Sequence, residues 1–230
     1  MKYSKDKRIV FEDESHSYFD TLTGEQLTSV TTVIKDWKQD FDEQAISLRS
    51  ANKEGVTQEV ILERWSVKRD LACELGTYLH QGLEDSMNGV TPELDFNKYA
   101  KAKIVSKFIA EVLDAGKITP VMVEPIAYSV EHGIAGQVDL VGKTSKGQFV
   151  FDWKTNEELK RKNFYQKMKI PFRHLDDCNF NHYQIQLNTY RELLQLDGVQ
   201  IDGMFIVWFD FFEYHFIKVT EFDVLKHVSK

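Results

Sequence analysis

The chain of 230 residues is long enough for one well-filled domain. Hydrophobic residues make up 42% of it and aromatic residues 13%, which is typical of a folded globular protein and excludes a disordered one. No apolar run follows the charged N-terminus or reaches the roughly 18 residues that span a bilayer. We therefore expect no secretion signal, no membrane partner and a cytoplasmic location.

The cysteine content limits the kinds of site that the chain can build. Cys73 and Cys178 lie far apart and form no Cys-x-x-Cys pair. An iron–sulfur cluster held by four cysteines is excluded. One disulfide is conceivable, but two unrelated buried thiols are the favoured interpretation.

The charge is unevenly distributed. A net charge of −7 taken alone argues against a nucleic-acid partner. Residues 154–174, however, contain seven Lys or Arg and two Glu. This segment would suit a phosphate-bearing polymer, although a solvated loop explains the charge equally well.

The first elements are expected within residues 8–33. Residues 9–12 and 17–20 have strand composition, and residues 21–24 form a turn. Ser29 or Thr28 is placed to cap a short helix that follows. The alternative is that hydroxyls such as those of Ser29 and Thr31 bind phosphate at the helix start.

Helices are expected over most of residues 42–115. Helical pieces over 42–66 are interrupted near Gly55, a helix covers 67–88, and another over 96–115 ends at Gly116. In the helix over 67–88, a leucine recurs every four residues and predicts one buried stripe: Leu71, Leu75, Leu79 and Leu83.

A second stripe on the same helix contains Gly76, His80 and Glu84. A histidine beside an apolar stripe is usually a packed or surface residue. Glycine one turn before it costs about 1 kcal/mol relative to alanine. This cost indicates that another backbone or a ligand approaches the helix there.

Three consecutive antiparallel strands are expected between residues 121 and 154. The first contains Glu124 in an apolar run, where an unpaired buried carboxylate would cost several kcal/mol, so we expect a cation, a metal or water beside it. Residues 143–147 have turn composition and would join the other two strands as a hairpin.

The hairpin register places charged side chains together. With the turn centred between Ser145 and Lys146, Asp139 falls opposite Asp152, with Cβ atoms about 4.5–5.5 Å apart. Lys154 shares their face, while Trp153 points the other way. These side chains form either a solvated polar face or a divalent-metal site with a cation beside it.

The last elements are a helix over 179–196, a central strand over 202–209, a neighbouring strand over 214–219 and a short C-terminal helix. In the helix over 179–196, one stripe carries His182, Gln186 and Tyr190, and the leucines belong to the core side.

These motifs resemble those of the PD-(D/E)xK nuclease superfamily. They are Glu124, Gly136-x-Val-Asp139, Asp152-Trp-Lys154-Thr155 and Gln186-x-x-x-Tyr190. Gly76-Thr-x-x-His80-x-x-x-Glu84 is similar to the histidine motif of the RecB-like clade. The segment starting at Ser29 is similar to the mitochondrial genome-maintenance exonuclease and its phage relatives. One departure is Val138, which stands where many members have proline.

The resemblance implies roles for these residues. Asp139, Asp152, His80 and the carbonyl of Trp153 would bind Mg²⁺ or Mn²⁺, and Lys154 would orient or activate the attacking water. Glu124 would support Lys154 or a second ion. Gln186 and Tyr190 would buttress the site and contact nucleic acid, and Ser29, Thr31 and Thr155 would also contact the substrate.

The resemblance also implies a fold: an α/β (α+β) restriction-endonuclease-like core, in which helices flank a mixed central sheet. We expect one nuclease domain over 1–230, with an N-terminal hairpin and helical lobe (1–118) that carries His80 and a catalytic sheet core (119–230).

The implied activity is that of a metal-dependent deoxyribonuclease in DNA repair or recombination. An exonuclease that acts on single-stranded DNA or duplex ends is favoured over an endonuclease, and a helicase, recombinase or single-strand-binding protein is the kind of partner it would have. The alternatives are a catalytically silent nucleic-acid-binding protein on the same fold and a hydrolase that uses two aspartates and a metal on an unrelated fold.

Overall fold

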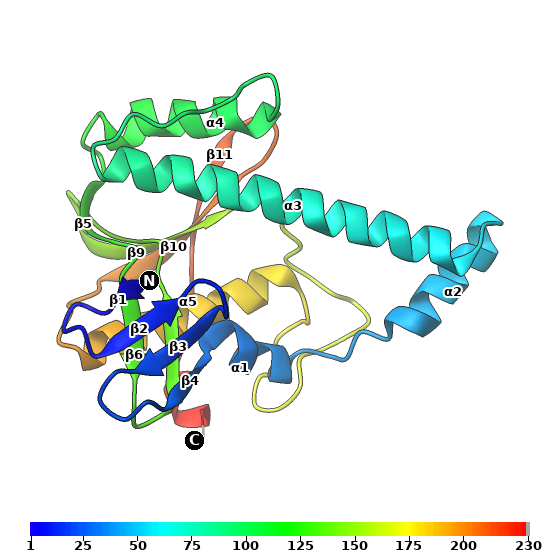
Figure 1. Cartoon of the computed structure of the whole chain (residues 1–230), viewed down its shortest axis with the longest axis horizontal. Coiled ribbons are helices and arrows are strands. Elements are labelled where there is room, and N and C mark those ends of the chain that lie inside the picture. Colours follow the sequence, from blue (N-terminus) through cyan, green and yellow to red (C-terminus); the bar gives the residue numbers. More distant parts are fainter. Residues whose placement is uncertain (229–230) are drawn as a thin grey trace.

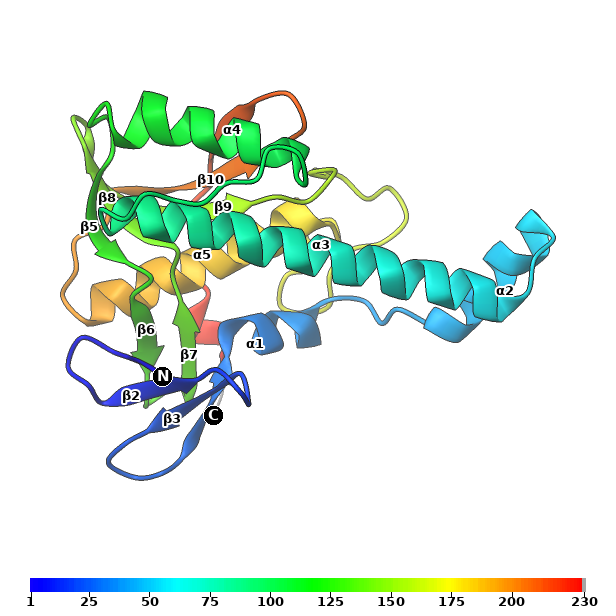
Figure 2. The same cartoon turned by 45° about the horizontal axis from the view of Figure 1, so that its top comes forward.

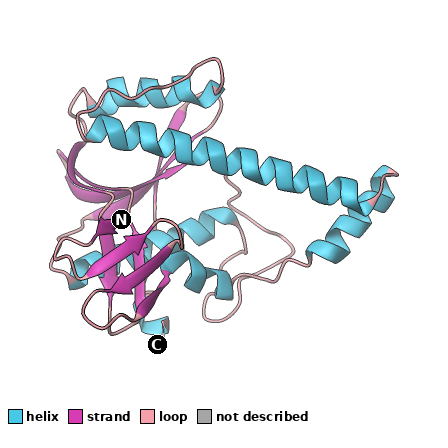
Figure 3. Cartoon of the chain, in the orientation of Figure 1, coloured by secondary structure: helices cyan, strands magenta, loops and turns pink. Residues whose placement is uncertain are grey.

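The computed structural model describes residues 1–228 and shows a mixed α/β architecture with two β-sheets (Figures 1 and 3). The six-stranded sheet has the order β1 (Lys2–Tyr3), β2 (Ile9–Glu12), β3 (Ser17–Asp20), β4 (Gln26–Ser29), β7 (Ile134–Gln137), β6 (Ile126–Ser129). The five-stranded sheet has the order β11 (Tyr214–Lys218), β10 (Gly203–Phe209), β9 (Gly147–Lys154), β8 (Leu140–Thr144), β5 (Thr119–Val123). Each sheet contains one parallel pair, β4 with β7 and β9 with β10.

The helices are α1 (Val30–Trp37), α2 (Glu43–Glu54), α3 (Gln58–Met87), α4 (Ala100–Phe108), α5 (Asn179–Leu196), the π-helical turn η1 (Ile109–Leu113) after α4, and the short 3₁₀ turn η2 (Leu225–His227). The predicted cap of α1 is confirmed, because the Ser29 hydroxyl accepts a hydrogen bond from the Thr32 amide at 3.1 Å. Gly55 ends α2 in the left-handed conformation, with φ +69°.

Helices pack on both faces of the five-stranded sheet (Figures 1 and 2). On one face, α3 and α4 bury a core that includes Leu79, Phe108 and Trp153. On the other face, α1 and α5 bury a core that includes Ile34, Ile185 and Ile206. This arrangement holds β9 between two apolar layers, so its polar side chains at the C-terminal end are screened from water.

The long helix α3 differs from the prediction in two ways. It runs unbroken from Gln58 to Met87, whereas a boundary was expected between 66 and 67. The leucine stripe is buried only in its second half: Leu79 and Leu83 are fully buried, but Leu71 is 59% exposed. The reason is that the N-terminal half of α3 projects beyond the sheet, with α2 folded against its end (Figure 1).

Three consecutive antiparallel strands were expected between 121 and 154. The antiparallel pairing is confirmed, but two of the three strands break and change sheet. The first run divides into β5 and β6 at Glu124-Pro125, where Glu124 has φ +48° and Pro125 has no amide hydrogen to donate to a ladder. The next run divides into β7 and β8 at Val138-Asp139. Pro125 is therefore a sign of the first break in the sequence itself, whereas no proline marks the second break at Val138-Asp139.

The two breaks lie side by side. The Glu124 amide donates to the Asp139 carbonyl at 3.1 Å, and the Val138 amide donates to the Pro125 carbonyl at 3.0 Å. We call these four residues the seam, because here two neighbouring chain segments pass from the five-stranded to the six-stranded sheet (Figure 2). Strands from both sides of the predicted division between 1–118 and 119–230 therefore share the six-stranded sheet; the last two residues of the range 119–230 lie outside the described part.

The predicted hairpin register is confirmed. Leu140 pairs with Phe151 and Thr144 pairs with Gly147, so the turn is centred between Ser145 and Lys146. Asp139 comes directly before the first of these pairs and therefore lies at the level of Asp152.

Two smaller expectations have clear outcomes. Cys73 and Cys178 form no disulfide; Cys178 is buried as expected, whereas Cys73 is exposed. Among residues 1–228, no helix is both long enough and apolar enough to cross a membrane.

The six-stranded sheet contains a buried ion pair that should make stability depend on pH. The Asp20 carboxylate is fully buried, and it accepts hydrogen bonds from the Arg8 guanidinium at 3.0 and 3.2 Å and from the Leu22 amide at 2.9 Å. The Arg8 guanidinium, followed by the Leu22 amide, holds the pKa of Asp20 below its usual 3.8.

We predict that Asp20→Asn lowers the free energy of unfolding at neutral pH. Because the pKa of Asp20 is lower in the folded state, its contribution is fully present above the unfolded pKa of about 4 and is lost as the pH falls through the folded value. The stability difference between the two proteins should therefore narrow below pH 4 in denaturant titrations. Glu14→Gln, on an exposed turn, is the control; a difference that stays constant with pH would contradict the assignment.

Candidate active site

Two carboxylates meet where β9 passes the seam. Asp152 belongs to β9 and is 2% exposed, and Asp139 lies in the seam just before β8. Oδ2 of Asp139 accepts a hydrogen bond from the Trp153 amide at 2.6 Å. This bond fixes Asp139 against β9, so the predicted proximity of the two aspartates is present.

Lys154 neutralises part of this charge. Its ammonium lies 2.5 Å from Oδ2 of Asp152 and 4.6 Å from the centre of the Tyr183 ring on α5. A cation over an aromatic face is held by the ring quadrupole as well as by the carboxylate. Lys154 is therefore fixed between β9 and α5 and points into the site.

His80 reaches the same place from α3. Its Nδ1 lies 3.5 Å from Oδ1 of Asp139, and its Nε2 lies 3.1 Å from the Trp153 carbonyl oxygen. The expected contact between this helix and the hairpin is therefore present. It joins segments separated by more than fifty positions in the chain.

Burial and neighbouring charge shift the pKa of every ionisable group here. Burial raises the pKa of Asp152 to about 6, although Lys154 opposes the rise. Burial alone would also raise the pKa of Asp139, but His80 and Lys154 hold it below its usual value. Burial acts to lower the pKa of His80 and of Lys154, but the aspartates raise both. The two carboxylates thus titrate as a pair in which Asp139 ionises first.

The donors around Asp139 and Asp152 fit a divalent cation chemically. They are two carboxylates, an imidazole and a backbone carbonyl, a set that suits Mg²⁺ and, through the imidazole, Mn²⁺. Oδ2 of Asp152 is buried, and the Lys154 ammonium is its partner there. Among residues 1–228, no three His, Cys, Asp or Glu side chains are placed so that together they could hold a metal ion. The imidazole of His80 instead faces the Trp153 carbonyl and Asp139.

Glu124 lies on the other side of His80. Its carboxylate contacts the Lys2 ammonium and the Gln137 amide, and the Lys2 ammonium also lies 3.4 Å from Glu84. The expectation that a cation would accompany Glu124 is thus met by Lys2 from β1. Burial raises the pKa of Glu124, and Lys2 only partly opposes this effect. The carboxylate contacts Lys2 rather than Lys154, which it was expected to support.

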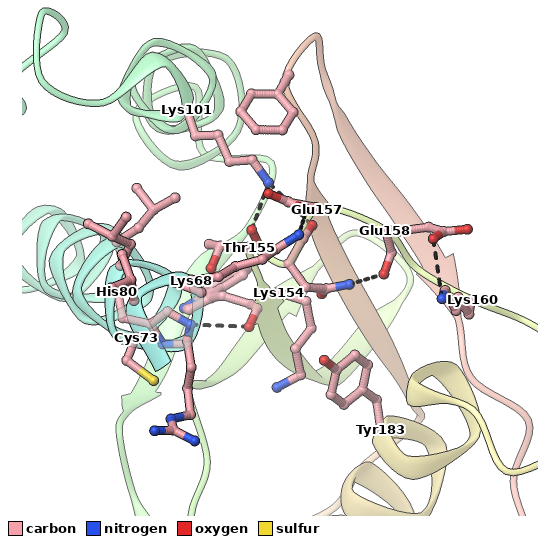
Figure 4. Close-up of a pocket in the computed structure, with 18 of the residues that line it drawn as sticks. Lys68, Cys73, His80, Lys101, Lys154, Thr155, Glu157, Glu158, Lys160 and Tyr183 are labelled. Atoms are coloured by element: carbon pink, nitrogen blue, oxygen red, sulfur yellow. Dashed lines mark hydrogen bonds and ion pairs between the residues drawn. The ribbon is translucent and has the colours of Figure 1, made fainter. Parts of the chain in front are cut away.

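Two cavities meet at His80, which lines both. The smaller, of about 410 Å³, contains the Lys2–Glu124 pair, Glu84 and Gly76. The larger, of about 1070 Å³, runs along α3 and the chain that follows β9. Figure 4 shows Lys154 in this larger cavity, with His80 on α3 on one side and Tyr183 on α5 on the other. The site is therefore open from two directions.

The large cavity has a mixed lining that suits an amphipathic polyanion. Its basic residues are Arg64, Lys68, Arg69, Lys101, Lys154 and Lys160, and its apolar or aromatic residues include Val67, Leu71, Leu75, Tyr183 and Phe211. Glu63, Glu157 and Glu158 also line it, and Lys68 pairs with Glu157 at 2.7 Å. Thr155 lies in this lining next to Lys154.

Glycine at 136 has a packing reason. A Cβ there would lie 2.5 Å from the Tyr190 ring, so only glycine lets β7 and α5 come this close. Gln186 donates a hydrogen bond to the Tyr190 hydroxyl at 3.0 Å. Tyr190 is buried, so it supports the seam from α5 and is not positioned to contact a substrate. At Gly76 an added Cβ would meet only Thr155 Oγ1 at 3.6 Å, an ordinary contact.

Ser29 and Thr31 lie at the start of α1, away from the two aspartates in sequence but next to β7. Ser29 pairs with Ala135, directly before Gly136, and its hydroxyl lies 3.0 Å from that of Thr31. The capping role explains Ser29 fully, and no contact joins either hydroxyl to Lys154.

Sequence reasoning missed three residues of this region. Lys2 is distant in the chain and carries no local signal. Tyr183, rather than His182, faces Lys154, while His182 lies 2.5 Å from Asp177. Lys101 is 1% exposed and could have been found, because it occupies a core position four residues before Val105 on an amphipathic helix.

The Lys101 ammonium joins two strand ends beside the site. It donates to the carbonyls of Thr155 at 2.7 Å, Phe209 at 3.0 Å and Asn156 at 3.2 Å. Burial lowers its pKa, which is the cost of holding an ammonium there. This contact fixes the chain directly after Lys154.

Comparisons with known proteins add little to this description. No protein-family model and no curated protein matches the sequence. Among solved structures, the chain is similar to one described as "Crystal structure of SSO0001", with 14% identity over 87% of this chain and 70% of that chain and a TM-score of 0.34. A likeness of this size supports no conclusion on fold or function.

We predict that Lys101→Met destabilises the protein by about 1–3 kcal/mol, because the methionine keeps the apolar stem but leaves buried carbonyls without a donor. Urea unfolding measures the change. Lys103→Met, an exposed position on the same helix, is the matched control and should change stability little. Equal effects of the two substitutions would contradict the anchoring role.

Proposed function

We propose that this protein is a divalent-metal-dependent deoxyribonuclease of the PD-(D/E)xK type, and that it degrades single-stranded DNA or DNA ends as an exonuclease. The observation that carries the proposal is the convergence of His80, Asp139, Asp152, the Trp153 carbonyl and Lys154. Of these residues, His80, Trp153 and Lys154 line a large, partly basic cavity. The mixed five-stranded sheet between two helical layers supports a restriction-endonuclease-like core.

The chemistry assigns a separate task to each group. A bound Mg²⁺ or Mn²⁺ would activate a water nucleophile and offset the negative charge of the phosphate. Asp139, held by the Trp153 amide, and Asp152 would hold the ion together with His80. The Lys154 ammonium, fixed by Asp152 and the Tyr183 ring, would orient the attacking water and stabilise charge that develops on the phosphate oxygens.

Buried charge of this kind is difficult to explain by stability alone. Placing ionised groups in a desolvated site costs free energy unless they are well paired, and structural ion pairs can often be replaced by apolar residues without loss. Here Asp152 is buried beside a second carboxylate, and burial raises its pKa to about 6 although Lys154 is paired with it. Such perturbed groups beside a cavity are typical of sites under functional constraint.

We predict that the protein cleaves labelled DNA with Mg²⁺ or Mn²⁺ and not with EDTA. Asp152→Ala and Lys154→Ala should each lower the rate by roughly 100-fold or more, since each removes a group that acts on the transition state. Single- and double-stranded substrates labelled at the 5′ or 3′ end show which strand end is attacked.

Asp202→Asn is the matched control for this assay. Asp202 lies at the opposite end of β9, where it accepts a hydrogen bond from the Gln148 amide at 2.8 Å, and its substitution should leave cleavage intact. Binding of DNA without cleavage under any metal would contradict the proposal and favour the catalytically silent alternative.

Exonuclease action generates a second prediction. If the strand enters the large cavity by its end, then a strand blocked at both ends or closed into a circle should resist cleavage while the open strand of the same sequence is degraded. Gel analysis over time distinguishes the cases. Efficient cutting of the closed circle would instead indicate an endonuclease.

A further inference from the structure

The connection between β9 and α5, residues 155–178, displays two neighbouring aromatic rings in solvent. Phe164 is 84% exposed and Tyr165 is 95% exposed. Exposing two large rings side by side is unfavourable in water, and no contact with another of residues 1–228 accounts for their position. Neither residue belongs to a motif of the proposed active site.

The chain around these rings is firmly held. The side-chain oxygen of Asn163 accepts hydrogen bonds from the amides of Tyr165 and Gln166 at 3.1 and 3.2 Å, and its amide group donates to the Asp177 carbonyl at 2.8 Å. The Asp177 amide in turn donates to the Gln166 carbonyl at 3.0 Å. The rings therefore stand on a fixed turn.

The second half of the connection is anchored in the core. Met168 and Phe172 are each 2% exposed, and the Phe172 ring packs against Trp37 of α1 with centroids 4.9 Å apart. The Lys169 amide donates to the Trp37 carbonyl at 2.8 Å. Because this connection is already held in place, its backbone loses little conformational entropy when a ligand binds to the two rings.

The charge of the same segment selects the ligand. Residues 160–173 contain six Lys or Arg and no Asp or Glu, in a chain of net charge −7. Three of these lysines pair with acids outside the range: Lys160 with Glu158, Lys167 with Asp176 and Lys169 with Asp40. Arg161 and Lys162 are exposed directly before the turn. Cations beside exposed aromatic rings match a single-stranded nucleic acid, whose phosphates and unpaired bases they contact at the same time.

The position of the rings matches a strand that continues out of the active site. Lys160 lines the large cavity, and Phe164 is four residues further along the chain, so their Cα atoms are at most about 14 Å apart. A strand bound in the cavity would reach the rings within a few nucleotides.

We propose that Phe164 and Tyr165 form a stacking platform for unpaired bases of a single-stranded nucleic acid that occupies the large cavity. The proposal rests on the proposed nuclease function and deepens it, because it narrows the substrate to a single strand. Bases in a duplex are not free to stack on the rings, whereas those of a single strand are.

Binding, rather than cleavage, tests the platform. The measurement is fluorescence anisotropy in EDTA with two labelled probes, an oligothymidylate and an abasic strand with the same number of phosphates. The double variant Phe164→Ala/Tyr165→Ala should weaken binding of oligothymidylate about fivefold or more and leave binding of the abasic strand unchanged. The exchange variant Phe164→Tyr/Tyr165→Phe, which keeps both rings, should restore the wild-type affinity.

Two further variants separate stacking from other effects. Lys162→Gln should weaken binding of both probes, because it removes a charge that each strand meets. Leu22→Ala removes an exposed apolar side chain on the β3–β4 turn and should weaken neither. Circular dichroism and thermal unfolding should match the wild type for all four, since every substituted side chain is exposed.

Three results would overturn the platform: unchanged affinity of the double alanine variant, an equal loss on both probes, or no binding of either probe by the wild type. If the wild type binds neither probe, the exposed rings would instead indicate a binding site for a protein partner. Base-dependent binding without cleavage in any metal would refute the nuclease function and keep the platform. DNA cleavage together with binding that does not depend on the rings would refute the platform and leave the nuclease function standing.

Discussion

The seam is the constraint on which the rest of the structure depends. At this point two adjacent segments leave one sheet for the other, and the backbone hydrogen bonds between Glu124 and Asp139 and between Pro125 and Val138 hold them together. A residue at a break points away from the regular pleat, which lets Asp139 turn its carboxylate toward β9 and Glu124 turn its own toward Lys2. One backbone feature thus supplies Asp139 to the paired aspartates and Glu124 to the smaller cavity.

Charge balance follows from this placement. Each acid at the seam is accompanied by a basic group from another element: His80 from α3 for Asp139 and Lys2 from β1 for Glu124. Asp152, beside the seam on β9, is paired with Lys154 of the same strand. Because carboxylates in a desolvated site are costly without partners, these pairs hold three elements at fixed positions around the seam. Tyr190 of α5 packs against the strand that leads to the seam, where its ring fills the space beside Gly136.

Much of this could be predicted from local patterns. The alternation of a hairpin placed Asp139 opposite Asp152 and Lys154 on the same face, and the helical period outlined α5 and the buried end of α3. The contact of His80 with the hairpin was expected from the resemblance to a nuclease family rather than from the residues, since no local period connects the two segments.

The remaining features depend on long-range packing. Pro125 marks the first strand break, but no proline marks the break at Val138-Asp139. The pairing of Lys2 with Glu124 requires the six-stranded sheet to bring β1 to the seam. Leu71 is exposed because α3 extends past the sheet, which its leucine period does not reveal.

The central claim is that the groups gathered at the seam form one divalent-cation site. A crystal equilibrated with Mn²⁺ and measured near the manganese absorption edge tests this claim directly. The account predicts an anomalous difference peak within bonding distance of Asp139, Asp152 and His80. A peak found only beside Glu84 and Glu124, or none at saturating Mn²⁺, would contradict it.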